Sequence, residues 1–459
     1  MRKEETLKKV GPSRGDPNRQ ILDNDISHKK VSVEPTTDIP QTTIEPTQEK
    51  KQFLASMRDL MKEVSLDEID EILSATIKHD RTSKLITFLS MVLTYTEEDQ
   101  QTVTFKSESS RGKSYIPLEI AQYFPQDDIQ TIAYASPAAF FHQHGLWIKE
   151  TKTVWIDLER KILIFLDQPH DLLLQRLRPL LSHDQKELNY KITDKTQKKG
   201  LKTKNILING YPTVIFCTAK QNIDEQDRTR VFILSPGATQ DKLKSSIALL
   251  SLKLSNTTEF KKNLEQDEKR EWLQARIQGI RDARINSIII PNHEEIYTEF
   301  IVEPPYLTPR HQRDFKRLVA LIKAHALLNC YTRRNPNNDH SITVNQTDIL
   351  EGFKLYNEIV AANELGLSPE IYEIWEQTIK PKLKARQDIG LRIDEVQTLY
   401  RKQYHRLLSE DRLKDIRKAL KSAGLIFELK DSDDKRKIRL FLLNEEEGEE
   451  EPEQQQRVL

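Results

Sequence analysis

The stretch "SESSRGKS", Ser107 to Ser114, decides how the rest of the chain is interpreted. It follows the apolar run "TVTF" and precedes "YIPLEIAQYF", so it lies between an expected strand and an expected helix. The pattern GxxxxGK[ST] at such a junction cradles phosphate groups, and Gly112, Lys113 and Ser114 match its second half. Ser107 stands where the first glycine belongs, which is acceptable if the turn does not need a positive φ. The alternative is a serine-rich loop with a chance GKS.

Each residue type in a phosphate-binding loop has a separate task. The lysine, here Lys113, reaches the β- and γ-phosphates, and the hydroxyl of Ser114 binds Mg²⁺. Backbone N–H groups turned toward the phosphates complete the cradle. We therefore expect ATP and Mg²⁺ as cofactors. The expected nucleotide contacts are Ser109, Ser110, Arg111, Gly112, Lys113, Ser114 and Tyr115.

The composition limits the number of domains and the classes of protein to which the chain can belong. The 459 residues are enough for two or three domains. Lys plus Arg and Asp plus Glu each number 71, so the net charge is zero and only local charge indicates a nucleic-acid partner. Cys217 and Cys330 are far apart and lack metal-ligand spacing, so neither a disulfide framework nor a zinc site is expected. With no signal-peptide core and no apolar run that spans a bilayer, we expect a cytoplasmic protein without membrane contact.

Short runs rich in β-branched residues alternate with helical pieces after the first hundred residues. Such alternation favours an α/β fold with a mostly parallel sheet. The expected strands are Thr102–Phe105, Ile129–Tyr134, Ile162–Leu166, Thr213–Cys217 and Val231–Leu234. "NSIIIPN" is expected as an isolated strand, and Arg313–Asn329 as an amphipathic helix.

An acidic residue ends one of these runs. In "KILIFLDQP", Asp167 comes where a buried strand would end. P-loop ATPases bind Mg²⁺ with a carboxylate at that point, so Asp167 and Ser114 are the expected metal ligands. Gln168 stands where many such enzymes have glutamate; it orients water but is not a base. Hydrolysis is then slow, or another carboxylate assists, with Glu159, Asp171 and Asp184 as candidates. A strand-end turn residue is the alternative for Asp167.

The order of the motifs resembles a known family. The loop, "LIFLDQPH", "LRPLLSHDQKE", "KITDK", "VIFCTA" and "DEQDRTRVFILSP" resemble AAA+ ATPases carried by prokaryotic mobile elements. These are similar to the MCM and superfamily 3 replicative helicases. The resemblance covers Lys84 to Val360, and the order of the short motifs makes it specific. The sequence departs from the family pattern at Ser107, Gln168 and Thr218, where Gly, Glu and Asn are usual.

The resemblance implies further catalytic residues. Thr218 would be the polar sensor at the γ-phosphate or the attacking water. Arg230, preferred over Arg228, would be an arginine finger that reaches the nucleotide of a neighbouring subunit. The alternatives are a strand-end threonine and a surface ion pair.

A second arginine is implied at the start of the lid helix "RDFKRLVALIKAHALLN". Arg313 would reach a neighbouring nucleotide, with Arg310 and Arg317 as rivals. The helix that follows is expected to begin at Thr347 or Asp348 as N-cap.

A basic hairpin is expected between the acidic strand and the sensor strand. The ends of "KELNYKITDKTQKKGLKTKNILING" alternate like strands, and the lysines gather at its tip. In the resembled helicases a hairpin here enters the ring channel and grips DNA phosphates. The expected contacts are Lys195, Lys198, Lys199 and Lys202. A solvated hairpin is the alternative.

The C-terminal pattern predicts a winged helix. "RIDEVQTLYRKQY" and "SEDRLKDIRKALKSAG" are expected helices, the second capped by Ser409 and ended by Gly424. "LIFELK" and "KIRLFLL" are expected strands around a wing. Arg417 and Lys421 on the second helix are expected DNA-phosphate contacts. A protein-interaction wing is the alternative.

These expectations combine into one domain plan. We expect a disordered arm (1–50), a helical lead-in (51–98), a P-loop AAA+ core (99–245), a helical lid and linker (246–365), a winged helix (366–445) and an acidic disordered tail (446–459).

The expected function is an ATP-dependent DNA helicase or translocase, a hexameric ring on single-stranded DNA that replicates a mobile element. One alternative is an ATP-switch initiator or loader, which Ser107 and Gln168 favour. Another is a winged-helix DNA-binding protein with a vestigial ATPase. A small-molecule kinase would have no use for the hairpin and the wing.

Overall fold

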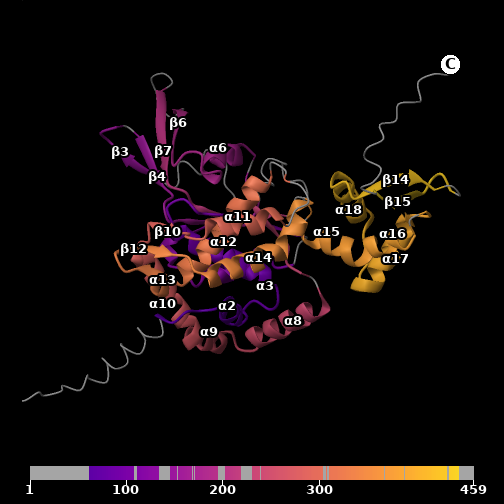
Figure 1. Ribbon diagram of the computed structural model, residues 1–459, viewed down its shortest axis with the longest axis horizontal. Helices are drawn as coiled ribbons and strands as arrows, with labels where there is room; N and C mark the ends of the chain where they lie inside the picture. The colour runs from indigo at the N-terminus through magenta and orange to yellow at the C-terminus, as the bar shows by residue number, and fades with distance from the viewer. Residues whose placement is uncertain are drawn as a thin grey trace, which may run out of the picture. The chain divides into compact units, whose positions relative to one another are not determined.

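The computed structural model describes most of the chain (Figure 1). The described residues are 61–107, 111–133, 145–151, 153–167, 169, 171–194, 202–218, 230–237, 239–302, 307, 310–365, 367, 369–386, 388–431 and 434–443. The chain divides into two compact units, residues 1–52 and 53–459, and every described residue belongs to the second. The predicted polar arm and acidic tail lie outside the described residues.

A five-stranded sheet, parallel throughout, forms the centre of the fold. Its strands are β1 (Thr102–Lys106), β2 (Ile129–Ile132), β5 (Ile162–Phe165), β8 (Thr213–Thr218) and β9 (Phe232–Leu234), in the order β2-β5-β8-β1-β9. All residues of β5, β8 and β9 are buried, as expected for strands covered on both faces. The predicted α/β class with a parallel sheet is confirmed, and all five predicted runs contribute strands.

The strand order determines which segments meet. β8 lies between β5 and β1, and β9 lies on the other side of β1. The register pairs Lys106 with Thr218 and Phe165 with Phe216, so β1, β5 and β8 end side by side. The segments after these strands therefore start from one edge of the sheet. Open α/β sheets bind ligands at this edge.

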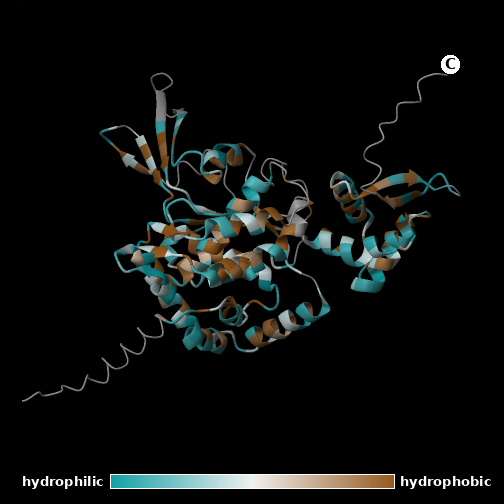
Figure 2. Ribbon diagram, viewed as in Figure 1, coloured by the Kyte–Doolittle hydropathy of each residue, from teal (hydrophilic) through white to brown (hydrophobic). Residues whose placement is uncertain are grey.

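Three helices from distant parts of the sequence pack together in the main core. They are α3 (Arg81–Val92), α12 (His311–Leu328) and α14 (Gln346–Glu364). Ten consecutive residues of α3, 83–92, are buried. Figure 1 shows the three helices side by side, and Figure 2 shows that apolar residues are frequent along them. The predicted helix over Arg313–Asn329 is confirmed as α12.

Further helices surround this core. They are α2 (Leu66–Leu73), α4 (Tyr115–Ala121), α6 (Asp171–Leu181), α8 (Gln240–Ser255), α9 (Thr257–Glu265), α10 (Glu268–Ala283), α11 (His293–Val302) and α13 (Cys330–Arg333), with 3₁₀ turns η1 (Leu93–Tyr95) and η2 (Gln126–Asp128). Among the described helices, none is both long and apolar enough to cross a membrane.

A second sheet carries a long hairpin. β6 (Glu187–Asp194) and β7 (Lys202–Asn209) pair antiparallel along their whole length, at the upper left of Figure 1. The predicted hairpin is therefore present. β3 (Leu146–Ile148) and β4 (Thr153–Asp157) complete the order β3-β4-β7-β6 and are not among the predicted strands.

The segment "NSIIIPN" is not an isolated strand, contrary to the prediction. Its residues Ser287–Ile289 form β10, which runs parallel to β12 (Asn338–Thr343). β12 also pairs with β11 (Arg334–Asn335). A strand alone would leave its backbone N–H and C=O groups unpaired, and β12 supplies the partners from later in the chain.

The C-terminal segment has an apolar core of its own. Its elements are α15 (Pro369–Ile374), a π-helical turn η3 (Trp375–Ile379), α16 (Lys380–Lys384), β13 (Leu391–Arg392), α17 (Ile393–Tyr404), α18 (Glu410–Ser422), β14 (Ile426–Lys430) and β15 (Ile438–Leu442). The three strands form an antiparallel sheet in the order β13-β15-β14. The side chain of Ser409 caps α18, and Gly424 follows it with a φ of +68°, so both predicted helix ends are confirmed.

Buried charges join α12 to α14. Oδ1 of Asp348 lies 2.7 Å from Nδ1 of His325, and its Oδ2 accepts a hydrogen bond from Arg333 Nε at 2.9 Å. The cap of α14 is Asn345, and neither Thr347 nor Asp348 as predicted: Asn345 and Asp348 exchange backbone-to-side-chain hydrogen bonds. Burial raises the pKa of Asp348, but hydrogen bonds from His325 and Arg333 outweigh it and hold the pKa below its usual value.

Replacing Asp348 by Asn removes this buried charge. Since the carboxyl pKa is lower in the folded chain, its stabilising contribution is present above the unfolded pKa of about 3.9 and is lost as pH falls through the folded value. Asp348→Asn should lower the free energy of unfolding by about 3 kcal/mol at neutral pH, and this deficit should shrink in acid. Urea denaturation across that pH range measures it. Asp282→Asn, exposed on α10, is the control and should change stability by less than about 0.5 kcal/mol; a pH-independent deficit for Asp348→Asn contradicts the account.

Candidate functional site

The stretch from Ser107 to Ser114 connects β1 to α4. Ser107 is buried directly after β1, whereas Ser109 and Ser110 lie outside the described residues. Gly112 has a φ of +92°, and a Cβ added there would meet no atom within 4 Å. The backbone conformation, rather than crowding, therefore requires a glycine, and the open space beside it has room for a ligand.

Cys217 marks where this loop meets the neighbouring strand. The buried thiol, on β8, donates to the carbonyl oxygen of Lys113 with an S···O distance of 3.3 Å. Burial raises the pKa of Cys217 to about 12, although a hydrogen bond with Ser114 and the charge of Lys113 lower it; the charge of Asp167 raises it further. Lys113, Ser114 and Asp167 thus all lie close enough to this thiol to affect its pKa, so the predicted phosphate and metal residues converge.

Asp167 and Thr218 reach this place because of the strand order. Asp167 is exposed just after β5, and Thr218 is buried as the last residue of β8. Both strands end at the edge from which the loop starts. Gln168 lies outside the described residues. Glu159 precedes β5 and so belongs to the opposite edge, which argues against it as an assisting carboxylate in the same chain.

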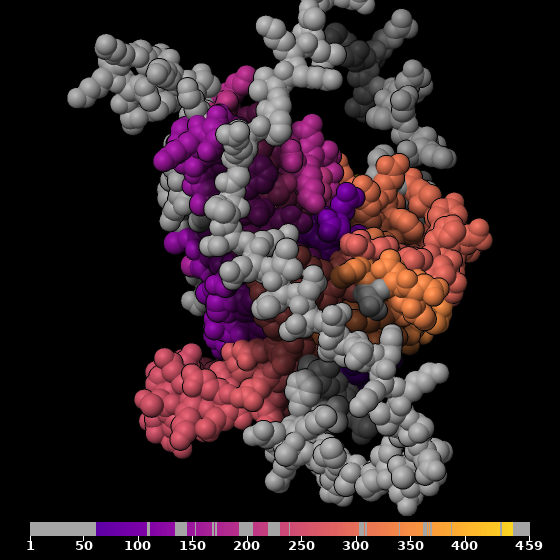
Figure 3. Space-filling view, turned by 90° about the vertical axis from the view of Figure 1, so that its left-hand side faces the viewer, coloured from indigo at the N-terminus to yellow at the C-terminus, as the bar shows by residue number. Residues whose placement is uncertain are grey.

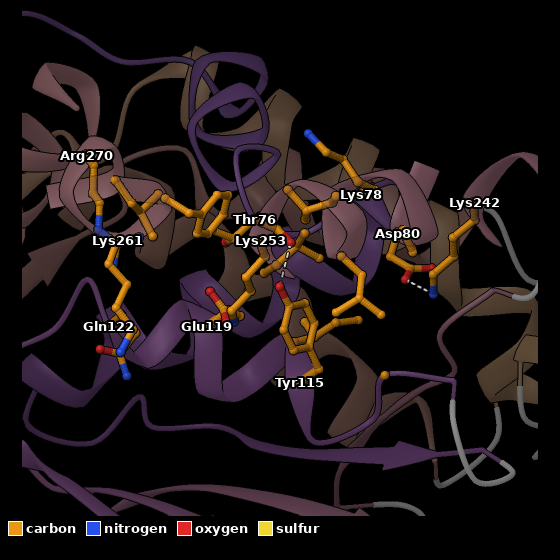
Figure 4. Close-up of a pocket in the computed structure, with 18 of the residues that line it drawn as sticks. Thr76, Lys78, Asp80, Tyr115, Glu119, Gln122, Lys242, Lys253, Lys261 and Arg270 are labelled. Atoms are coloured by element: carbon orange, nitrogen blue, oxygen red, sulfur yellow. Dashed lines mark hydrogen bonds and ion pairs between the residues drawn. The ribbon is translucent and has the colours of Figure 1, made fainter. Parts of the chain in front are cut away.

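A groove of about 1020 Å³ opens beside the loop (Figure 4). Its walls come from the turn between α2 and α3, from α4, and from α8 to α10. Helices α8 and α9 contribute to the lobe at the lower left of Figure 3. Part of the lining is apolar: Ile77, Ile116, Leu243 and Phe260. A cavity of this size accommodates a nucleotide-sized ligand.

Tyr115 links the loop to the wall of the groove. It is the first residue of α4, and its hydroxyl donates to the carbonyl oxygen of Thr76 at 2.9 Å, drawn as a dashed line in Figure 4. Burial and the nearby charge of Glu119 raise its pKa, so the phenol stays neutral. Tyr115 as a whole is 40% exposed and lines the groove.

Two residues that the sequence does not single out form an ion pair beside the loop, and one of them, Lys242, contacts it. Lys242, nearly buried on α8, pairs with Asp80 and donates to the carbonyl oxygens of Gly237 at 2.9 Å and Arg111 at 3.4 Å (Figure 4). The carboxylate of Asp80 accepts a hydrogen bond from the N–H of Gly237 at 2.8 Å. The backbone of Asp80 has a φ of +54°. Lys242 follows the sheet in sequence and Asp80 precedes it, so only the folded chain brings them together.

The arginines predicted to reach the nucleotide of a neighbouring subunit lie in different parts of the fold. Arg230 precedes β9 and so belongs to the edge of the sheet opposite the loop. Arg313 is exposed in the first turn of α12. Its rivals Arg310 and Arg317 both pair with Asp314, at 3.0 and 2.7 Å. Burial lowers the pKa of Arg317 to about 10, although its charged partner offsets this.

Of the predicted hairpin contacts, the structure describes only Lys202. Lys195, Lys198 and Lys199 lie outside the described residues. Lys202 opens β7 opposite Asp194. The contact of these lysines with DNA stays a prediction.

The predicted contacts of the C-terminal segment differ in their surroundings. Arg417 on α18 donates through Nε to Glu428 of β14 at 2.8 Å, and its side chain is 18% exposed. Lys421, one turn later, is exposed, as are Lys414 and Lys418. The lysines present the more accessible charge.

Ser114 and Asp167 are the residues that fit Mg²⁺. Hydroxyl and carboxylate oxygens are suitable ligands, and substrate phosphates and waters usually complete the shell. Ser114 hydrogen-bonds with Cys217, and the charge of Asp167 raises the pKa of that thiol, so both residues lie near it. Among the described residues, no group of three or more His, Cys, Asp or Glu could hold a metal ion.

Comparison with known proteins assigns no function to this site. No model of a known protein family matches the chain, and a search of curated proteins finds no match.

Two glycines allow a matched test of the loop. Gly112 and Gly424 have φ values of +92° and +68°, and an added Cβ has open space at both. Each Gly→Ala variant should lose about 1–2 kcal/mol of stability from backbone strain. Only Gly112→Ala should weaken binding of inorganic triphosphate with Mg²⁺, by roughly tenfold, which calorimetric titration measures. Equal triphosphate affinity in both variants would show that the loop backbone does not face the anion.

Proposed function

We propose that the chain is an AAA+ ATPase that moves along single-stranded DNA as a hexameric ring. The observation that carries this proposal is the convergence of Lys113, Ser114 and Asp167 around Cys217, at the carboxyl edge of a parallel sheet. In P-loop NTPases this edge holds the phosphate lysine, the Mg²⁺ hydroxyl and the Mg²⁺ carboxylate.

The strand order supports the AAA+ class. The loop strand β1 and the acidic strand β5 are separated by β8, which ends at Thr218. This is where the resembled ATPases carry their sensor. Thr218 would then touch the γ-phosphate or the attacking water.

The nucleotide would lie along the loop and in the groove. Lys113 would donate to the β- and γ-phosphates and balance their charge, and Ser114 and Asp167 would hold Mg²⁺ between phosphate oxygens. The apolar wall of the groove and the ring of Tyr115 suit a base and ribose. Phosphoryl transfer requires mainly such positioning and charge stabilisation.

Assembly would complete the site. Arg230 lies at the sheet edge opposite its own loop, so in a ring it would face the nucleotide of another copy rather than its own. Arg313 is exposed in the first turn of α12, and its rivals Arg310 and Arg317 pair with Asp314. An arginine supplied in this way stabilises the charge that develops during transfer.

Two elements would contact DNA. The β6–β7 hairpin would bring its lysines to the channel of the ring, where sequence-independent phosphate contacts suit translocation. The C-terminal segment has the helix–helix–strand–strand order of a winged helix, with α18 as the recognition helix. Its exposed Lys414, Lys418 and Lys421 suit phosphate contacts.

Loss of the loop lysine should abolish turnover. Lys113→Ala removes the cation at the phosphates and should lower the ATPase rate at least roughly a hundredfold. Lys354→Ala, on α14 with a 53% exposed side chain, is the control and should keep the wild-type rate. Steady-state phosphate release, with and without single-stranded DNA, measures both, and DNA should stimulate the wild-type rate.

Other outcomes separate the alternatives. Unchanged turnover in Lys113→Ala, together with no stimulation by DNA, would contradict the translocase. ATP binding without turnover, lost in Lys113→Ala, would favour an ATP-dependent initiator or loader. DNA binding with no ATP binding would favour a winged-helix protein with a vestigial loop.

A further inference from the structure

A buried carboxylate joins the loop to the C-terminal segment. Oε1 of Glu370, on α15, lies 2.9 Å from Nη2 of Arg111, and its Oε2 lies 2.8 Å from Nη2 of Arg412 on α18. The side chains of Arg111, Glu370 and Arg412 are 8%, 9% and 11% exposed. One carboxylate therefore bridges the loop and α18.

Arg111 is placed where a bound phosphate would affect it. It directly precedes Gly112, and it lines both the large groove and a smaller cavity of about 70 Å³. Its carbonyl oxygen accepts from Lys242, while its guanidinium pairs with Glu370. Nucleotide phosphates attract guanidinium groups strongly, through charge-assisted and often bidentate hydrogen bonds.

The surroundings of Glu370 make its charge important. The smaller cavity is also lined by Glu373, Tyr400 and Arg406. Burial, followed by the charge of Glu370, raises the pKa of Glu373. The charge of Arg111 lowers the pKa of Glu373 in turn, but the net shift is upward, so a second ionised carboxylate is disfavoured beside Glu370.

We propose that Glu370 is a positioning residue that sets nucleotide affinity through Arg111 and couples the loop to α18. The inference rests on the proposed nucleotide site. Glu370 competes with the phosphates for the guanidinium of Arg111. When bound phosphates pair with that guanidinium, Glu370 remains paired with Arg412 alone, and the contact between the loop and the C-terminal segment weakens.

Linkage makes this coupling reciprocal. Whatever weakens the pairing of Glu370 with Arg111 strengthens nucleotide binding, and bound nucleotide weakens that pairing by the same factor. Arg412 acts in the opposite sense, because it shares the carboxylate and reduces its pull on Arg111. Removing Glu370 or Arg412 should therefore shift nucleotide affinity in opposite directions.

Fluorescent ATP-analogue titration of the full chain tests the coupling. Glu370→Gln should bind the analogue about fivefold or more tightly, and Arg412→Gln more weakly by a similar factor. Glu376→Gln is the control. Glu376 lies nearby in sequence and forms a partly exposed ion pair with Lys380, so its variant should keep wild-type affinity. Affinity changes of opposite sign in the two variants indicate coupling. A general loosening of the C-terminal segment would shift the affinity of both variants in the same direction.

Hydrogen exchange supplies an independent readout. The analogue should speed backbone exchange in α15 and α18 of the wild type but not of Glu370→Gln, where the link is already broken. Circular dichroism shows whether the C-terminal segment of Glu370→Gln stays folded. If it does not, two measurements still decide the outcome: the analogue affinity of Arg412→Gln, and the effect of the analogue on hydrogen exchange in the wild type.

The results separate this inference from the proposed function. If wild type binds the analogue, Lys113→Ala does not, and the Glu370 and Arg412 variants bind like wild type or shift in the same direction, the coupling is wrong and the nucleotide site stands. If wild type does not bind the analogue, both are wrong.

Discussion

Parallel pairing of β5, β8 and β1 is the constraint on which the site depends. Because the three strands run in one direction and end in register, the loop after β1, Asp167 after β5 and Thr218 on β8 share one edge. The strands are buried, so their backbone groups must pair with each other. Cys217 lies at the junction, where its thiol donates to Lys113. A slip in this register would separate the residues that the proposed chemistry needs together.

Contacts from outside the sheet stabilise the loop. Tyr115 binds the backbone at Thr76, and Lys242 binds the backbone of Arg111. Glu370 holds the side chain of Arg111 from the C-terminal segment. The lead-in, the helix after β9 and the C-terminal segment therefore all meet at one loop, which gives a bound ligand a route to affect distant elements.

Local sequence patterns predict the parts of this fold that depend on nearby residues. β-branched runs identify the five strands, and Ser409 and Gly424 identify the ends of α18, since capping involves residues within one turn. Pairing between distant segments is harder. β10 finds its partner in β12, and β4 runs beside β7, and no local pattern specifies either pairing.

The same distinction applies to the site. Lys113, Ser114 and Asp167 follow from motif spacing, whereas Lys242, Asp80 and Glu370 are ordinary charged residues until the fold brings them to the loop. Arg310 and Arg317 become poor candidates for a trans role only when their pairing with Asp314 is known.

The most direct test of the account is a cryo-electron-microscopy structure of the chain with a non-hydrolysable ATP analogue, Mg²⁺ and single-stranded DNA. We expect phosphates on Lys113, a metal ion held by Ser114 and Asp167, and Arg230 of a neighbouring copy facing the nucleotide across a ring interface. Nucleotide bound away from the loop, or a monomer with an empty loop at saturating analogue, would contradict it.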